Sequence, residues 1–292
     1  KQLIAHEPQI MDPVSFCFDE QGNILVAESF RQENAVPDNR SSPFWLEDDL
    51  QSQTAQDRLA MYEYWADQRK NGMDFYTEFE ERVRRLEDRD GDGRYETQKD
   101  FLDDLNICSS ALPGRGGVWV LNPPYLLFYH DRNGDDLPDG DPEVHLEGFG
   151  MEDSHSVTNS LRWGPDGWIY GAHGSTCTAE IQGIKFLGQA IWRYHPPTKR
   201  FEVFAEGGGN TWCVDFDSNG RTFSGTNYGN TRGVHYPQGG CFIKSWAKHG
   251  PLMNPHAFGF YQHMAHEGFK PRFPQSMIIY EGGALPDYEK HG

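Results

Sequence analysis

The chain has 292 residues, with 14% aromatic residues, 32 glycines and 18 prolines, a composition that favours many short strands and sharp turns over long helices. Its formal net charge of −18 excludes a Lys/Arg-rich nucleic-acid-binding surface and disfavours binding to an anionic membrane. No run of 18 or more apolar residues is present, so the sequence predicts no membrane span.

A strand–turn–strand unit recurs along the chain. It reads VSFCFDEQGNILVAES from Val14, NSLRWGPDGWIYGAHG from Asn159 and NTWCVDFDSNGRTFSGTN from Asn210, each with a turn centred on X-Gly. Weaker copies begin at Gly116 and Asn254. Starting points near 14, 118, 160, 212 and 256 give spacings of 104, 42, 52 and 44 residues, and the last three spacings suit a four-stranded propeller blade.

The long first interval contains an insertion. From Asp48 onward the hydrophobic period changes from strand-like to helical. Four apolar residues then fall on one helical face: Phe75, Phe79, Val83 and Leu86. The sequence therefore predicts an all-β fold, a single β-propeller domain over residues 1–292, with a helical insertion at about 48–87. A β-sandwich with irregular loops is the alternative.

Five inner-strand signals are visible, and the last segment, MIIYEGGALPDYEKHG, lacks an obvious closing strand. The ring has either five blades or further blades that this chain does not contain, and we expect the second.

Three asparagines, Asn159, Asn210 and Asn254, each stand at the entry of an inner strand. A propeller would bring them together at one mouth of its channel, where amides can ligate a cation or orient a polar ligand. An asparagine before a strand is also a common turn residue, so this interpretation depends on the recurrence.

His155 is the candidate for proton transfer. It precedes the inner strand that contains Asn159, so it should lie at the same channel mouth, and an unperturbed imidazole titrates near neutral pH. Asp153 would orient it. An exposed loop histidine without a role is the alternative.

Two acidic loops have the spacing of calcium-binding loops. In DRDGDGRYE, alternating carboxylates precede a glycine that permits a sharp bend. The twelfth position is Lys99 where a helix-loop-helix site has glutamate, so we predict a shorter calcium loop. Its candidate ligands are Asp88, Asp90, Asp92 and Glu96. DRNGDDLPD repeats the spacing with Asp136 in place of the glycine, and its candidate ligands are Asp131, Asn133, Asp135 and Asp139. Solvated acidic turns are the alternative, and neither loop implies catalysis.

Several stretches together resemble one family. They are DPVSFCFDEQGNILVAES, DRNGDDLPDG, LEGFGMEDSHSVTNSLRWGPDGWIYGAHG, NPHAFGFYQHMAHEGF and IIYEGG, spread from about residue 10 to 283. They resemble the PVC-type haem-binding CxxCH or "membrane-bound dehydrogenase" proteins, whose N-terminal propeller is similar to soluble glucose and sorbosone dehydrogenases. The resemblance implies a six-bladed propeller, a pyrroloquinoline quinone held with calcium, and a histidine such as His155 that takes the substrate hydroxyl proton.

The chain departs from this pattern at the cofactor site. Those enzymes bind the quinone through an Arg-Asn pair, whereas here Gly209 precedes Asn210, and Arg232 is the candidate replacement. The full set of candidate cofactor-binding residues is Asn159, Asn210, Trp212, Asn227, Arg232, Asn254 and His256. The CxxCH haem module is missing from this chain, so a quinone enzyme would need another electron acceptor, such as a cytochrome c.

The leading hypothesis is a periplasmic or extracellular dehydrogenase of a small-molecule sugar or alcohol. One alternative is a non-catalytic, calcium-stabilised propeller that binds a glycan or a protein. Another is a calcium-dependent lactonase in which Asn159, Asn210 and Asn254 hold one catalytic metal ion.

Overall fold

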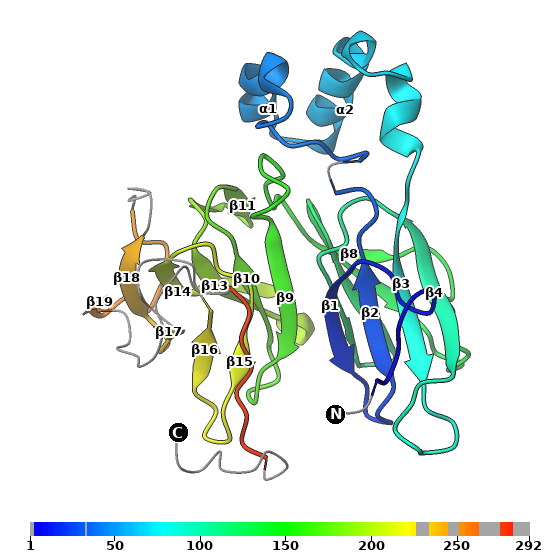
Figure 1. The fold of residues 1–292 in the computed structure, drawn as a ribbon. Helices are drawn as coiled ribbons and strands as arrows, with labels where there is room; N and C mark the ends of the chain where they lie inside the picture. Colours follow the sequence, from blue (N-terminus) through cyan, green and yellow to red (C-terminus); the bar gives the residue numbers. More distant parts are fainter. Residues whose placement is uncertain (1–2, 33, 226–233, 245–250, 263–274, 283–292) are drawn as a thin grey trace.

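The computed structural model describes residues 3–32, 34–225, 234–244, 251–262 and 275–282. Consecutive antiparallel sheets succeed one another along the chain and form a β-propeller, with a small helical group at one end of the strands (Figure 1). Four blades lie within the described residues, the fourth with three strands. The predicted all-β propeller is confirmed.

The first two blades are regular four-stranded meanders. Blade one contains β1 (Pro13–Phe18), β2 (Ile24–Glu28), β3 (Glu81–Glu87) and β4 (Thr97–Leu105). Blade two contains β5 (Ser110–Pro113), β6 (Gly117–Asn122), β7 (Tyr125–His130) and β8 (Glu143–Glu147).

The third sheet is larger, and the fourth is short. Blade three contains β9 (Thr158–Trp163), β10 (Ile169–His173), β13 (Ala190–His195) and β14 (Arg200–Gly208), with the hairpin β11 (Ala179–Ile181) and β12 (Ile184–Phe186) inserted and a 3-10 turn at Pro196–Thr198. Strands β18 (Gly240–Lys244) and β19 (Gly259–Tyr261) extend its outer edge in parallel. Blade four contains β15 (Asp215–Phe216), β16 (Thr222–Ser224) and β17 (Val234–His235).

Side-chain chemistry sets the first hairpin. Asp19 accepts hydrogen bonds from the backbone N–H groups of Gln21 and Asn23, at 2.9 and 2.8 Å. Gly22 has φ +88°, a left-handed conformation that glycine adopts without steric cost. The turn therefore closes β1 onto β2 without a long connection.

Hydrophobic cores lie between adjacent blades, as stacking around an axis requires. Cys17 and Leu25 of blade one pack with Val120 and Leu127 of blade two. A second core joins blade two to blade three and contains Trp119, Leu126, Leu161, Ile169, Trp192 and Tyr194. The inner strand β5 contacts both β1 and β9, which places the inner strands side by side around a common centre.

Two expected inner strands are corrected. The segment from Gly116 supplies the second and third strands of blade two, because Ser110–Pro113 is its inner strand. Within the described residues, the segment from Asn254 supplies β19, which pairs with β18 at the outer edge of the third sheet.

The helical insertion lies between β2 and β3. It contains α1 (Leu46–Gln51), α2 (Ala55–Tyr64) and 3-10 turns at Pro43–Trp45, Ala66–Gln68 and Gly72–Thr77. The predicted end at residue 87 is wrong. Val83 and Leu86 belong to β3, opposite Ala27 and Ile24, because the edge of β2 needs a hydrogen-bonded partner. None of the described helices is long and apolar enough to cross a membrane.

An arginine organises the insertion. The Arg69 guanidinium lies 4.4 Å from the ring centre of Trp45 and 5.1 Å from that of Phe44. It also donates to the Tyr76 hydroxyl at 3.1 Å and to Ser42 Oγ at 2.7 Å. This aromatic cluster gives the insertion a small core of its own.

Candidate active site

A cavity of about 1120 Å³ opens at the end of the blades where β1 begins. Its wall is formed by the start of β1, the chain that follows β2, the loop before β9 and the segment that enters blade four. Most of the lining residues carry amides, hydroxyls or charged groups, and the indole of Trp212 is the large aromatic surface. A site lined by such residues suits a hydroxyl-bearing ligand.

His155 lies in this cavity wall, as the sequence predicts. Its Nδ1 is 3.0 Å from Asp38 Oδ2, and its Nε2 is 3.1 Å from Gln32 Nε2. We assign the ring proton to Nδ1, so that Asp38 accepts it and the Nε2 lone pair accepts from the Gln32 amide. This tautomer leaves Nε2 able to accept a proton.

Asp38 holds this tautomer. Its side chain is 5% exposed, and it comes from the chain between β2 and the first 3-10 turn of the insertion. Burial alone would raise the pKa of Asp38, but hydrogen bonds from the Arg40 side chain and backbone N–H, with attraction from Arg40 and His155, lower it. The carboxylate therefore stays ionised at neutral pH.

Arg40 completes the charge arrangement. Its Nη2 donates to Asp38 Oδ2 and lies 3.6 Å from Asp153 Oδ1. It also lies 2.5 Å from His155 Nδ1, and because a guanidinium only donates, Arg40 has to turn away from the ring when Nδ1 carries the proton. The Arg40 side chain is 69% exposed, so it can turn toward a ligand in the cavity.

Asp153, the predicted orienting residue, has a weaker relation to the imidazole. Its Oδ1 is 3.6 Å from His155 Nδ1 and accepts the His155 backbone N–H at 2.9 Å. Asp153 thus shapes the turn that carries His155, whereas Asp38 makes the closer contact with the ring. A local pattern could not reveal Asp38, because 117 positions separate it from His155.

Asn159 and Asn210 connect neighbouring blades at this mouth. The buried Asn159 amide donates to the Val157 carbonyl at 2.9 Å and to the Thr211 carbonyl at 3.1 Å. Asn210 donates to the His155 carbonyl at 3.2 Å, and its Oδ1 accepts the Ser175 N–H at 3.0 Å. Of these two asparagines, Asn210 lines the cavity, beside Trp212.

Asn254 and His256 are not brought to this cavity. The Asn254 backbone N–H donates to Glu206 at 3.0 Å, and His256 Nε2 lies 3.8 Å from Glu202 Oε2, both on β14. The expected convergence of three asparagines is therefore wrong for Asn254, because its segment follows the outer edge of the third sheet. Asn227 and Arg232 lie outside the described residues.

The two acidic loops differ in structure. Asp88, Asp90, Asp92 and Glu96 offer carboxylate oxygens within 4.8 Å of one another, as a cation site requires. In the second loop Asp139 instead pairs with Arg132 at 3.2 Å, and Asp131 accepts the backbone N–H of Asp135 at 3.1 Å. No comparable cluster contains Asp131, Asn133, Asp135 and Asp139 within the part of the chain that the structure describes.

A buried carboxyl behind the cavity wall leads to a prediction about stability. Burial raises the pKa of Glu81 from its ordinary 4.5 to about 7, despite hydrogen bonds from Ser29 and the Cys108 N–H and attraction from Arg31. Between these values the folded protein holds a proton that the unfolded chain has lost. The free energy of unfolding should therefore fall as the pH rises through this window, by roughly 3 kcal/mol.

Urea unfolding at pH 5 and pH 8 measures this effect. Glu81→Gln should remove most of the difference between the two pH values, whereas the exposed neighbour Glu80→Gln should leave it unchanged. An equal pH dependence in parent and Glu81→Gln would show that Glu81 is not the group responsible.

Fold and site together define a β-propeller with a histidine–carboxylate pair in a cavity at the end of the blades where β1 begins. The chain belongs to the family described as "Domain of unknown function (DUF7133)", whose model matches residues 1–277. No curated protein matches it in sequence.

Distant similarity to solved structures is found as well. The PQQ-bound aldose sugar dehydrogenase of Streptomyces coelicolor is 13% identical, with a TM-score of 0.48 over 88% of this chain and 68% of that one. A Thermus thermophilus protein described as an oxidoreductase (glucose dehydrogenase) is 16% identical, with a TM-score of 0.45 over 92% and 73%. A protein described as a gluconolactonase is 14% identical, with a TM-score of 0.36 over 57% and 58%. These scores are too low to assign an activity, and the resemblance to the PVC-type haem-binding family stays a prediction.

Proposed function

We propose that the protein is a quinone-dependent dehydrogenase that oxidises a hydroxyl group of a sugar or alcohol. The observation that carries the proposal is the His155 imidazole in a polar cavity, with Nδ1 3.0 Å from the buried Asp38 carboxylate. A base oriented by an ionised partner is the arrangement that removes a hydroxyl proton near neutral pH.

In the proposed reaction, His155 Nε2 takes the proton of the substrate hydroxyl after the substrate displaces the Gln32 amide. Asp38 stabilises the imidazolium that forms. A quinone held in the cavity would supply the acceptor for the hydride that the substrate carbon loses as it becomes a carbonyl carbon, and an external acceptor would take up the electrons.

The described lining fits a planar, oxygen-rich cofactor. Trp212 offers an indole face for stacking, Asn34 and Asn210 offer amide groups, and Arg40 offers a guanidinium for a carboxylate. We assign Trp212, Asn210 and Arg40 as the described residues that would hold the quinone. Arg232 and Asn227 remain proposed contributors.

Reconstitution tests the proposal. The protein is loaded with calcium and pyrroloquinoline quinone, then offered aldoses and polyols with an artificial dye as electron acceptor. We expect dye reduction with at least one substrate class and quinone binding by calorimetry. If neither is observed, the proposal fails, and a propeller that only binds a glycan or protein becomes the better description.

We also propose a structural calcium ion at Asp88, Asp90, Asp92 and Glu96. The clustered carboxylates support it, together with Gly93, whose φ of +84° allows the sharp bend of such loops. Calcium at about 100 times its dissociation constant should raise the free energy of unfolding by about 2.7 kcal/mol. Chemical unfolding with calcium and with chelator measures the difference. Asp90→Asn should abolish it, and an equal difference in that variant would contradict the assignment.

Partner and location complete the proposal. We propose a periplasmic or extracellular protein with a cytochrome c as electron acceptor. The net charge of −18 suits an acceptor with a basic surface.

A metal-dependent lactonase is the second candidate. Asp38, Asp153 and His155 offer ligand atoms within 4.8 Å of one another, a set that can hold one catalytic cation. Because the Arg40 guanidinium contacts all three residues, a metal ion would have to displace it. Lactone hydrolysis that requires added metal and proceeds without quinone would favour this candidate over the dehydrogenase.

A further inference from the structure

A second cavity, of about 900 Å³, lies at the opposite end of the blades from His155. Strand β1 shows this arrangement, because Val14 near its start lines the His155 cavity and Phe18 at its end lines the second one. Likewise, β9 begins just after His155 and ends at Trp163, in the wall of the second cavity. The two cavities therefore open at opposite ends of the blades and have no lining residue in common.

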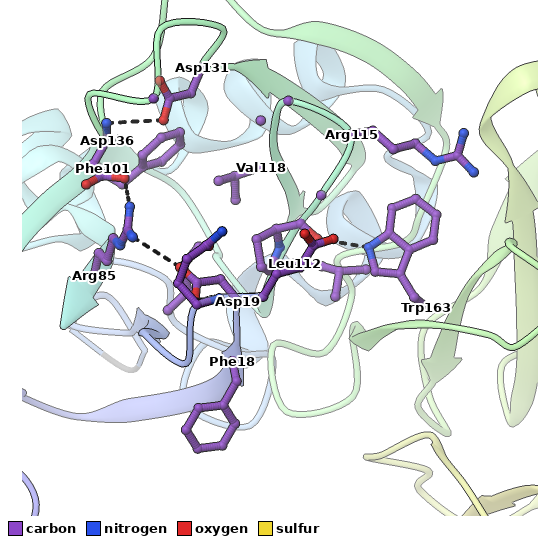
Figure 2. Close-up of a pocket in the computed structure, with 18 residues that line it drawn as sticks. Phe18, Asp19, Arg85, Phe101, Leu112, Arg115, Val118, Asp131, Asp136 and Trp163 are labelled. Carbon is purple, nitrogen blue, oxygen red and sulfur yellow. Dashed lines mark hydrogen bonds and ion pairs between the residues drawn. The ribbon is translucent and has the colours of Figure 1, made fainter. Parts of the chain in front are cut away.

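The second cavity has an apolar base between blades one and two. Its buried apolar residues are Leu25, Phe101, Leu112 and Val118. Trp163 forms one side, and its Nε1 donates to the Pro113 carbonyl at 2.9 Å, which fixes the plane of the indole (Figure 2). Phe18 is 56% exposed at the edge. Aromatic faces in a partly open cavity suit a ligand with an apolar C–H face.

Charged groups stand on both sides of this apolar base. Figure 2 shows Arg85 with Asp19 and Asp136 away from Trp163, with Arg85 Nη2 3.2 Å from Asp19 and its Nη1 paired with Asp136. The Asp19 carboxylate already accepts hydrogen bonds from Gln21 and Asn23 within its own turn. The Asp136 carboxylate, 20% exposed, can accept further hydrogen bonds. This side can therefore bind a hydroxyl donor.

Arg115 stands on the other side. Its guanidinium lies 5.0 Å from the centre of the Trp163 ring and donates to the Gly167 carbonyl at 3.4 Å, and among the described residues it forms no ion pair with a carboxylate. Its backbone has φ +60°, between Gly114 at +139° and Gly116 at +77°. A non-glycine residue held in the left-handed region carries strain that is common at ligand-binding positions. A guanidinium that lacks a carboxylate partner binds a ligand carboxylate through two hydrogen bonds.

We propose that this cavity binds an acidic sugar unit, a hexuronate residue of an oligosaccharide. The ligand carboxylate would draw the exposed Arg115 guanidinium away from the face of Trp163, the C–H face of the sugar ring would stack on the indole face so uncovered, and a hydroxyl would donate to Asp136. The ligand class follows from the three surfaces together: a guanidinium, an aromatic face and a carboxylate acceptor within one cavity. The inference does not depend on the proposed dehydrogenase activity.

Calorimetry with trigalacturonate, and with maltotriose as the neutral counterpart, tests the site. Arg115→Asn removes the guanidinium while keeping a residue type that tolerates the left-handed conformation. We expect this variant to bind trigalacturonate at least about 10-fold more weakly than the parent. Lys199→Asn is the matched control, because Lys199 is also an exposed cation in the left-handed region, with φ +53°, and lies outside the cavity.

The outcomes separate clearly. Tight binding by the parent and by Lys199→Asn, with loss in Arg115→Asn, supports the site. Equal affinity of parent and Arg115→Asn, equal affinity of the parent for maltotriose and trigalacturonate, or no binding of trigalacturonate would each overturn it. Trigalacturonate binding by a protein that shows no dye reduction would leave this inference standing and count only against the dehydrogenase.

Discussion

The variant His155→Gln is expected to lose about 10³-fold in kcat for hydroxyl oxidation, because a positioned general base contributes typically 10²- to 10⁴-fold. Glutamine keeps a polar side chain at the cavity wall but cannot accept a proton at neutral pH. KM and quinone affinity should stay within a few-fold of the parent, since the proposed cofactor contacts come from Trp212, Asn210 and Arg40. Steady-state kinetics with the dye acceptor and calorimetry measure the two effects separately.

His130→Gln is the matched control. His130 Nε2 also faces a carboxylate, Glu143 at 2.7 Å. His130 lies on β7 and lines neither the His155 cavity nor the second cavity, which contains Arg115 and Trp163. Its kcat should equal that of the parent. A loss in His130→Gln as large as that in His155→Gln would point to general destabilisation, and an active His155→Gln would remove the proposed base.

Asp38→Asn is expected to lower kcat by about 10²- to 10³-fold with little change in KM. Asparagine preserves the shape of the buried side chain but can turn its NH₂ toward His155 Nδ1, which favours the wrong tautomer and no longer stabilises the imidazolium. The low pKa of Asp38 makes the effect present throughout the neutral range. Kinetics from pH 6 to pH 9 measure whether the loss in kcat is the same across that range.

Asp153→Asn distinguishes the two carboxylates near the imidazole. Because Asp153 Oδ1 is 3.6 Å from Nδ1 and its side chain is 25% exposed, we expect less than about a tenfold loss in kcat. A larger loss in Asp153→Asn than in Asp38→Asn would return the orienting role to Asp153. Asp38→Glu should restore part of the activity, which a purely structural role of Asp38 does not predict.

The helical insertion has a part in this chemistry. Asn39, between Asp38 and Arg40, donates to Asp49 Oδ2 at 2.5 Å and to the Glu152 carbonyl at 3.1 Å. Its Oδ1 accepts the Trp45 indole N–H at 3.0 Å. The insertion thus holds Asp38 and Arg40 against the loop that carries His155. Substitutions in the insertion that disturb these contacts should therefore lower kcat, whereas substitutions of exposed residues elsewhere should not.

Local chemistry made much of the propeller predictable. The turns at Gly22 and Gly167 have φ of +88° and +79°, as X-Gly hairpins between apolar strands require. Its position just before an inner strand was enough to predict that His155 lies at the end of the blades where β1 begins. The inner strand of blade two was missed because Ser110–Pro113 is only four residues long and all but its last residue are buried, so it shows no alternation.

Long-range pairing could not be predicted. Strand β3 carries Arg82, Arg84 and Arg85 among its apolar residues, so its hydrophobic spacing resembled a helix until pairing with β2 determined its structure. The buried Arg84 side chain forms an ion pair with Asp100. Hydrophobic periodicity alone does not predict a buried arginine at this position. Asp38 was missed for the same reason, since its contact with His155 exists only in the folded chain.

A single-turnover experiment tests the central claim most directly. Parent and His155→Gln proteins, loaded with quinone to equal occupancy, are mixed anaerobically with an aldose, and quinone absorbance is followed. We predict rapid quinone reduction in the parent and reduction slower by about 10³-fold in the variant. Equal rates in the two proteins, or no reduction in a parent that demonstrably binds quinone, would contradict it.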